Sequence, residues 1–340
     1  MRARMENWLI GHWYTNDRPP WYLRSLEPLY RFGFKRARKK AAHHKRCYRA
    51  PVPVIVVGNL TAGGAGKTPL VIRLCQLATD MGLRPGIAST GYGRKGQQTL
   101  QVRAGDDARV CGDEPVLLAH RTGVPVVVSA DRVEAVRKLA GMGVDLVISD
   151  DGLQHAALAR DIELCVVDGE RGFGNGHLIP AGPLREPVAR LASVDYVISN
   201  GDWPGAVSEV DVNTMHMEVY VVHSLDEEKM YPVEEFASMC KNVTVQAMAG
   251  IGNPGRFQRL LESQGFVAEI EIFPDHHAFS EGDFASIKPG AAIIMTEKDA
   301  VKCRSFDLEN AWYIPVEARL PEAFEKSFAG RLASLTRKKT

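Results

Sequence analysis

Short apolar runs separated by amphipathic segments dominate residues 51–200. Runs with the length of a buried strand are 52–57, 85–89, 125–129, 145–149, 162–167 and 194–199. Several are followed by helical spacing, such as Leu70, Val71 and Leu74 after the first run. Continuous apolar strands that alternate with helices are typical of a parallel sheet with helices on both faces. The pattern therefore predicts an α/β fold.

A second, smaller α/β unit is predicted in the C-terminal third. Apolar runs near 243–249, 267–273 and 291–296 repeat the strand-and-helix pattern. Apolar and polar residues alternate over 213–222, which predicts an extended β linker. The expected division of the chain is 1–50 (a basic, aromatic N-terminal helix), 51–212 (the larger α/β domain), 213–222 (the linker) and 223–340 (the second domain with a C-terminal helix).

The glycine-rich loop after the first strand carries the clearest chemical signal. It ends in Gly66-Lys67-Thr68, and a helical pattern follows. Glycines let backbone N–H groups turn toward a polyphosphate, and the N-terminus of the next helix favours the same anion. In such P-loops the lysine reaches the β and γ phosphates and the hydroxyl contacts Mg²⁺. The predicted nucleotide-binding residues are Thr61, Ala62, Gly63, Gly64, Ala65, Gly66, Lys67 and Thr68.

Thr61 departs from the usual motif, which has glycine at that position. The alternative is an ordinary strand-to-helix turn that happens to contain three glycines. The strand before the loop and the helical pattern after it favour a P-loop NTPase-like sheet. A second glycine-rich turn, 250–255, resembles a dinucleotide fingerprint only superficially, because Pro254 interrupts it and no acidic partner follows.

Charged residues gather at the predicted carboxyl ends of the strands, where open parallel sheets bind ligands. Asp150 and Asp151 follow one strand directly, where P-loop proteins place a carboxylate for Mg²⁺. A solvated turn is the alternative. Asp113 and Glu114 precede Pro115 at the start of a predicted helix, so they either cap that helix or serve as base and metal ligand.

Two adjacent histidines, His276 and His277, follow Asp275 in the second unit. A histidine that met an aspartate of the first unit would orient and tune a base. The alternative is a structural or exposed pair. Neighbours in sequence rarely face one ion, so a metal site built on both histidines is not expected.

Positive charge is concentrated in the first fifty residues. They hold 13 Lys/Arg and 3 Asp/Glu, a balance of +10, whereas the remainder has 29 against 38, a balance of −9. Aromatic residues accompany the charge, and Leu23, Leu26, Tyr30 and Phe34 are predicted to share one side of a helix over 21–44, which ends near Arg36, Arg38, Lys39 and Lys40. Aromatic and basic residues together favour an anionic membrane surface. A helix packed on its own domain and a nucleic-acid contact are the alternatives, the latter without any recognition motif.

Composition narrows the remaining classes. Six cysteines lie far apart without CxxC or metal spacing, which predicts free thiols in a reducing cytosol. No apolar run approaches the ~18 residues of a membrane span, and no signal peptide is evident. No obligate protein partner is indicated.

Taken in order, the motifs resemble the tetraacyldisaccharide 4′-kinases, the lipid A 4′-kinases of Gram-negative bacteria. The matching runs are GNLTAGGAGKTP (58–69), GYGR (91–94), GDEP (112–115), ADR (130–132), DDGLQH (150–155), DGERGFGNGHLIPAGPLREP (168–187), DH (275–276) and TEKDAVK (296–302). Together they cover nearly the whole chain. The resemblance implies ATP- and Mg²⁺-dependent phosphorylation of the 4′-hydroxyl of a tetraacylated lipid A disaccharide 1-phosphate precursor.

The resemblance also implies a location and residue roles. It implies two closing α/β/α domains and a peripheral protein on the cytoplasmic face of the inner membrane, docked through its N-terminal helix. Asp113 would be the catalytic base, assisted by His276. Thr68, Glu114, Asp150 and Asp151 would serve Mg²⁺. The substrate and phosphate region would be lined by Tyr92, Arg132, Gln154, His155, Arg185 and Glu186.

Two positions depart from the family pattern. Ala65 replaces a threonine, and Thr90 replaces an arginine that could contact phosphate. Neither change touches Lys67 or Asp113, so activity is expected to survive. The rival class is a P-loop switch that hydrolyses its nucleotide, but 296–299 (TEKD) places lysine one position late for a guanine-binding motif.

Overall fold

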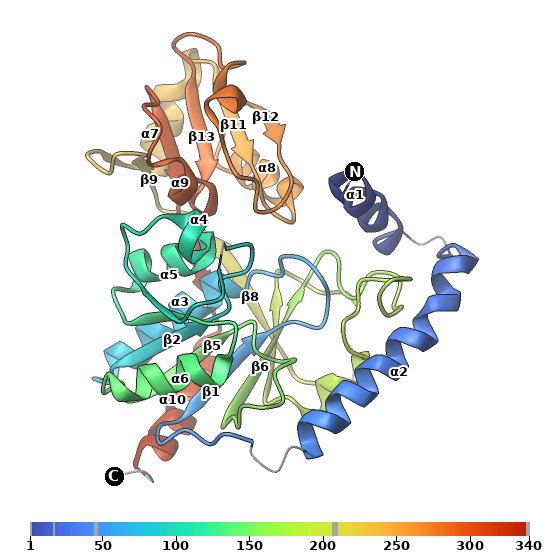
Figure 1. Cartoon of the computed structure of the whole chain (residues 1–340). Helices are drawn as coiled ribbons and strands as arrows, with labels where there is room; N and C mark the ends of the chain where they lie inside the picture. Colours follow the sequence, from blue (N-terminus) through green and yellow to red (C-terminus); the bar gives the residue numbers. More distant parts are fainter. Residues whose placement is uncertain (1, 16–17, 44–46, 95, 206–209, 338–340) are drawn as a thin grey trace.

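The computed structural model describes residues 2–15, 18–43, 47–94, 96–205 and 210–337, and two sheets organise them (Figure 1). The larger sheet has the strand order β15-β8-β7-β6-β1-β5-β2-β4-β3. Its strands are β1 (Val54–Gly58), β2 (Pro85–Ser89), β3 (Leu100–Val102), β4 (Val126–Val128), β5 (Leu146–Asp150), β6 (Ile162–Asp168), β7 (Tyr196–Asn200), β8 (Val212–Glu218) and β15 (Glu317–Arg319). In this sheet order, all strands from β8 through β4 run parallel to one another. Strands β3 and β15 are antiparallel to their neighbours and form the two edges.

Strand β1 occupies the centre of this sheet, and all its residues are buried. Ile55 and Val57 pack into one apolar core and Val54 and Val56 into the other, because successive side chains point to opposite faces. In the parallel register Val57 pairs with Asp150. The P-loop after β1 therefore emerges beside the carboxylates after β5.

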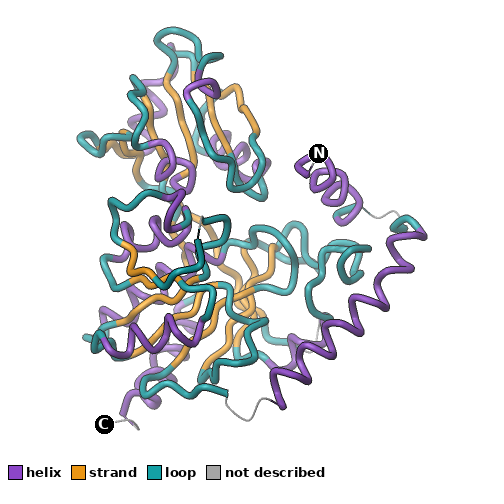
Figure 2. Tube along the Cα trace, viewed as in Figure 1, coloured by secondary structure: helices purple, strands orange, loops and turns teal. Residues whose placement is uncertain are grey.

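Helices cover both faces of the large sheet (Figures 1 and 2). They are α3 (Lys67–Asp80), α4 (Ala108–Cys111), α5 (Asp113–Thr122), α6 (Arg132–Gly141), α10 (Glu322–Arg337) and a 3₁₀ turn over Val188–Ser193. The core on one face contains residues of α3, α5 and α10, and the core on the other contains residues of α6 and Leu191. The predicted fold class is thereby confirmed.

The second sheet has the order β10-β9-β14-β13-β11-β12. Its strands are β9 (Val221–Ser224), β10 (Met230–Pro232), β11 (Val245–Ala249), β12 (Ala268–Ile272), β13 (Ala292–Thr296) and β14 (Ala311–Ile314). Its helical segments are α7 (Val233–Met239), α8 (Pro254–Ser263), α9 (Glu297–Cys303) and 3₁₀ turns over Cys240–Asn242 and Glu281–Phe284. The second unit is thus a smaller α/β layer structure.

The chain crosses between the two sheets twice. Residues 219–220 lead from β8 to β9, and 315–316 lead back from β14 to β15. The expected linker is therefore mostly a strand of the first sheet. The C-terminal helix also differs from the expectation: Phe324, Phe328 and Leu332 of α10 pack into the first core. The division at 223–340 misses this return because helical spacing shows an apolar face but not the surface that covers it.

Of the N-terminal helices, α2 (Trp21–His43) lies along the outside of the first unit (Figure 1). Helix α1 (Arg2–Trp13) extends away from it and contacts it through Trp13, whose Nε1 donates to the Pro180 carbonyl. Leu23 is buried, and the Tyr30 hydroxyl donates to the Arg185 carbonyl over 3.1 Å. Leu26, predicted on the same side of the helix, is 47% exposed, so burial does not extend to it. The side chains of Arg38, Lys39 and Lys40 lie outside the described residues.

The expectation of free thiols is also met. The six cysteines are free thiols. None of the helices within the described ranges combines the length and apolarity needed to cross a bilayer.

The return of α10 to the first unit predicts a stability effect. Phe328 is fully buried, so Phe328→Ala should lower the free energy of unfolding by about 3–5 kcal/mol through lost burial and a cavity. Chemical denaturation measures this change. Lys326→Ala, on the exposed side of the same helix, should change it by less than about 0.5 kcal/mol. Equal values for both variants would show that α10 does not pack as described.

Candidate active site

The P-loop joins β1 to α3 and is held from two sides. Gly66 adopts a φ of 91°, and a Cβ there would lie 2.2 Å from the Asn200 amide nitrogen, so only glycine fits. That nitrogen donates to the Ala65 carbonyl over 3.2 Å. The Ala65 methyl is itself buried in the core, which gives the departure from threonine an apolar environment. On the other side, the Ala62 N–H donates to the Pro183 carbonyl over 2.7 Å.

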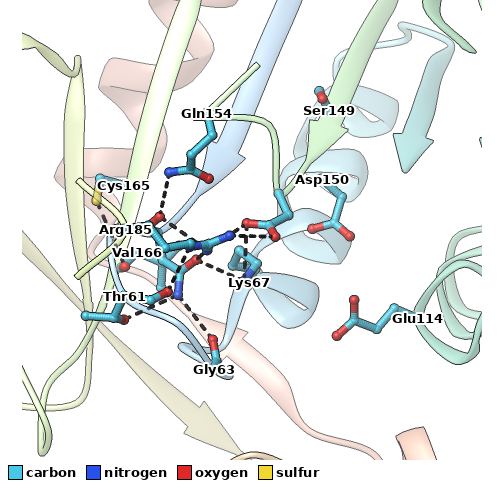
Figure 3. A network of polar contacts seen from close by, with 12 residues as sticks. Thr61, Gly63, Lys67, Glu114, Ser149, Asp150, Gln154, Cys165, Val166 and Arg185 are labelled. Carbon is cyan, nitrogen blue, oxygen red and sulfur yellow. Dashed lines mark hydrogen bonds and ion pairs between the residues drawn. The ribbon is translucent and has the colours of Figure 1, made fainter. Parts of the chain in front are cut away.

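Lys67 and Arg185 lie close together beside this loop (Figure 3), and both pair with Asp151. Lys67 Nζ lies 3.2 Å from Asn59 Oδ1 and 3.5 Å from Asp151 Oδ1. Arg185 donates to both Asp151 oxygens over 3.1 and 3.2 Å and to the Thr61 carbonyl over 3.1 Å. Burial by itself would raise the pKa of Asp151, but the charges of Lys67 and Arg185 hold it below its usual range. Asp151 is therefore ionised and positions both cations.

Asp150 stands in the opposite electrostatic situation. Its side chain is 1% exposed, and Oδ1 has no hydrogen-bond partner. Burial, together with the negative charge of Glu114, raises the pKa of Asp150 to about 7. In Figure 3 the Glu114 and Asp150 carboxylates point toward one another, to one side of Lys67. A buried carboxylate oxygen without a partner is the donor that a hard cation needs.

No group of three or more His, Cys, Asp or Glu side chains in the described residues could hold a metal ion alone. Mg²⁺ in kinases is held by one or two carboxylates together with the substrate phosphates. Asp150 and Glu114 beside the P-loop fit that pattern. Thr68 opens α3 on the same loop and is half-buried.

The second unit brings a histidine to the first unit's Asp113. His276 Nδ1 lies 2.9 Å from Asp113 Oδ2 and 3.1 Å from Oδ1. Burial would raise the pKa of Asp113, but the hydrogen bond from His276 and the charge of Lys298 lower it. Burial would lower the pKa of His276, and the bond to Asp113 raises it above its ordinary value. The two residues thus form a hydrogen-bonded pair across the interface.

Further contacts join the units on the other side of the P-loop. Arg256 pairs with Asp168 at 2.7 Å, and Arg171 donates to the Gly252 carbonyl over 2.8 Å. A Cβ on Gly252 would lie 2.9 Å from the Gly64 nitrogen, so the two glycine-rich turns meet closely. The second unit therefore contacts the glycine-rich loop at Gly64.

Comparisons with known proteins agree with this arrangement. The family model described as "Tetraacyldisaccharide-1-P 4'-kinase" (LpxK) matches residues 19–333. The chain belongs to this family. It is 45% identical over 333 residues to the tetraacyldisaccharide 4′-kinase of Shewanella amazonensis, with 94% of each chain covered. It is 42% identical over 347 residues to that of Methylobacillus flagellatus, with 99% of each covered.

A solved structure of the family has the same fold. LpxK from Aquifex aeolicus, described as an "apo" form in complex with ATP, superposes with a TM-score of 0.76 at 28% identity. The match covers 92% of this chain and 99% of that one. The family resemblance expected from the sequence is confirmed, and this member of the tetraacyldisaccharide-1-P 4′-kinase family is an enzyme of the kinase class.

The residues expected to line this kinase's substrate region differ in burial and in hydrogen-bond partners. Arg132 is 2% exposed and donates to Ser149 Oγ, to the Ala88 carbonyl and to the carbonyls of Asp150 and Asp151. Its guanidinium is thus engaged with the protein itself. It fixes the backbone that carries the two aspartates.

Gln154 and Glu186 are also engaged internally. Gln154 Nε2 donates to Glu186 Oε1 over 2.9 Å and to the Asn59 carbonyl over 3.2 Å. Glu186 is 3% exposed, so it supports the glycine-rich loop from the protein interior. Burial, reinforced by the charge of Arg132, lowers the pKa of His155 to about 4 and keeps this half-buried imidazole neutral. Tyr92 is exposed, and its ring centroid lies 5.1 Å from that of His276.

Two residues of the site were missed as candidates. Asn59 is fully buried and bonds Lys67, Arg185 and the Gly63 carbonyl. Its place directly after β1 could have suggested a structural role in the loop. Lys298 contacts Asp113 and Glu114 only because the two units meet, and no local pattern carries that information.

The raised pKa of Asp150 predicts an unusual pH dependence without metal. A carboxyl whose folded pKa lies above its unfolded value destabilises the fold as pH rises through this range. In chelator at pH 8, Asp150→Asn should therefore be more stable than the wild type, by on the order of 2–4 kcal/mol. Denaturant titrations should show the difference shrinking toward pH 5.

Asp145→Asn is the matched control with the opposite sign. The hydrogen bond from Arg84 lowers the pKa of Asp145, so its removal should destabilise the protein at pH 8. If Asp150→Asn were no more stable than the wild type at pH 8, the ionised Asp150 carboxylate would not destabilise the fold as described.

Proposed function

We propose that this chain transfers the γ-phosphate of ATP to the 4′-hydroxyl of a tetraacylated lipid A disaccharide 1-phosphate precursor. The observation that carries the proposal is the Asp113–His276 pair beside a P-loop and a buried Asp150 whose Oδ1 has no hydrogen-bond partner. Membership of the tetraacyldisaccharide-1-P 4′-kinase family and the similarity to an LpxK described in complex with ATP support the donor and the acceptor.

The phosphate donor would be held by the residues of the P-loop. Backbone N–H groups of 63–68 and the N-terminus of α3 would face the phosphates, and Lys67 supplies a positive charge. Thr68, Glu114, Asp150 and Asp151 would hold Mg²⁺, which neutralises charge on the phosphate oxygens. Arg185 adds a second cation near Lys67 and keeps Asp151 ionised.

Asp113 would accept the proton of the attacking hydroxyl. Its lowered pKa makes it a weak base, but it is also always ionised at neutral pH. Phosphoryl transfer has a loose transition state, so positioning and charge contribute more than early proton removal. His276 fixes the Asp113 carboxylate through Nδ1 and comes from the second unit. The base would thus be complete only when the two units are in contact.

The acceptor would reach this site from an anionic membrane surface. The outer face of α2 exposes Tyr22, Leu26, Leu29 and Phe32, with Trp21 at the start of the helix. Arg24, Arg31, Lys35 and Arg36 are exposed on the same helix. Apolar side chains surrounded by basic ones suit anionic headgroups at an interface. We propose peripheral docking on the cytoplasmic face of the inner membrane through this surface.

The catalytic assignment predicts a contrast between neighbouring histidines. His276→Gln and Asp113→Asn should each lower kcat by about 10²–10⁴-fold and leave ATP affinity nearly unchanged. His277→Gln should retain kcat, because His277 contacts Asp283 within its own unit. The assay measures transfer of labelled γ-phosphate to tetraacyldisaccharide 1-phosphate. Release of phosphate only to water would instead support a P-loop switch. Wild-type turnover in Asp113→Asn would exclude Asp113 as the catalytic base.

The docking surface predicts a loss of vesicle binding. Leu29→Ser combined with Phe32→Ser should weaken binding to vesicles containing anionic phospholipid by about tenfold or more, since each buried side chain contributes about 1.5–3 kcal/mol. Cosedimentation measures the affinity. Val267→Ser is the control, because Val267 is 92% exposed on the second unit. Unchanged binding of the double variant would rule out this face of α2.

A further inference from the structure

Lys298 places one cation among the charged groups of the interface. It lies in the first turn of α9, and its side chain is 17% exposed. Its Nζ is 3.1 Å from Glu114 Oε1, 3.2 Å from Asp275 Oδ1 and 3.9 Å from Asp113 Oδ2. It is also 3.4 Å from His276 Nε2. Two of these four partners belong to the first unit and two to the second.

Helix stability does not account for a lysine at this position. The first turn of a helix favours negative side chains, and a cation there is unfavourable. Removing an ammonium group from water costs several kcal/mol unless opposite charges surround it. Burial alone would lower the pKa of Lys298, but Glu114, Asp113 and Asp275 raise it, so the side chain is charged. Its charge is compensated by the residues of the site. Asp299, the adjacent acidic residue of the same helix, pairs with Lys302 instead.

The position of Lys298 restricts the proton on His276. An ammonium group has only donors, and an ionised carboxylate has only acceptors. The imidazole lies between the two, with Nδ1 toward Asp113 and Nε2 toward Lys298. The neutral ring can satisfy both neighbours only by donating from Nδ1 and accepting at Nε2. A ring flip would replace both nitrogens with carbons.

A separate ion pair shares the docking of α9 on α5. Arg121 Nη1, near the end of α5, lies 2.7 Å from Glu297 Oε2. This contact is adjacent to Lys298 in sequence but does not touch His276. Docking of the units therefore does not depend on Lys298 alone.

We propose that Lys298 is a positioning residue that holds His276 in the Nδ1–H tautomer against Asp113. It also keeps Glu114 beside the site by neutralising its charge. The consequence for turnover rests on the proposed role of Asp113 as base, whereas the tautomer does not.

The tautomer is tested directly by ¹⁵N spectra of the histidine rings in the full-length protein. Spectra are recorded at a pH where the imidazoles are neutral, and the His276 signals are assigned by their loss in His276→Gln. The wild type should show His276 protonated at Nδ1. Lys298→Met should shift the signals toward the Nε2–H form, and Lys298→Arg should retain Nδ1–H. Unchanged His276 signals in Lys298→Met would overturn the proposal.

Turnover separates positioning from docking. Lys298→Met should lower kcat by about 10²-fold, the effect of a misplaced group, with the KM for ATP changed by less than about threefold. Lys298→Arg should recover at least about tenfold of that loss because it keeps the charge and the donors. Lys288→Met, which removes an exposed lysine paired with Glu269, should change neither kcat nor the spectra.

Glu297→Gln distinguishes the two roles of the α5–α9 contact. It weakens docking at Arg121 without removing the donor to His276, so the tautomer should persist and kcat should fall by less than in Lys298→Met. An equal loss of kcat in the two variants would reduce Lys298 to a docking residue. If Asp113→Asn proved fully active, the proposed base would fail while the spectra still decided the role of Lys298.

Discussion

Compensation of buried negative charge is the constraint on which the site depends. Asp113, Glu114, Asp150 and Asp151 converge where the P-loop meets the second unit, and Asp113 and Asp150 are buried there. Asp151 is neutralised within the first unit by Lys67 and Arg185. Asp113 and Glu114 receive their cation from the second unit through Lys298. One Asp150 oxygen remains without a partner, which leaves the demand that a bound cation would satisfy.

The two units are also held together largely through charged contacts. Two short crossings, 219–220 and 315–316, join the sheets, and several of the contacts between the units are ion pairs. Ion pairs regain water when they separate, so they resist opening less than an apolar interface would. Assembly of the Asp113–His276 pair therefore depends on the same contact between the units that brings Gly252 to Gly64.

Local chemistry made part of the site predictable. The P-loop and the aspartates after β5 follow strands whose continuous apolar character sets them in a parallel sheet, and parallel strands end at one edge. Arg132 shows what local chemistry leaves open. The sequence places a charged residue near the site, but only the folded chain brings together the backbone carbonyls that surround its guanidinium.

The sequence by itself determined the parallel sheet, the nucleotide loop and the family, because these depend on short-range spacing and residue type. Tertiary structure alone decided that α10 returns to the first core, that Leu26 faces outward, and that Lys298 meets Glu114. Each of those facts depends on which surfaces dock. A periodic pattern shows that a helix has an apolar face, but packing between distant segments selects its partner.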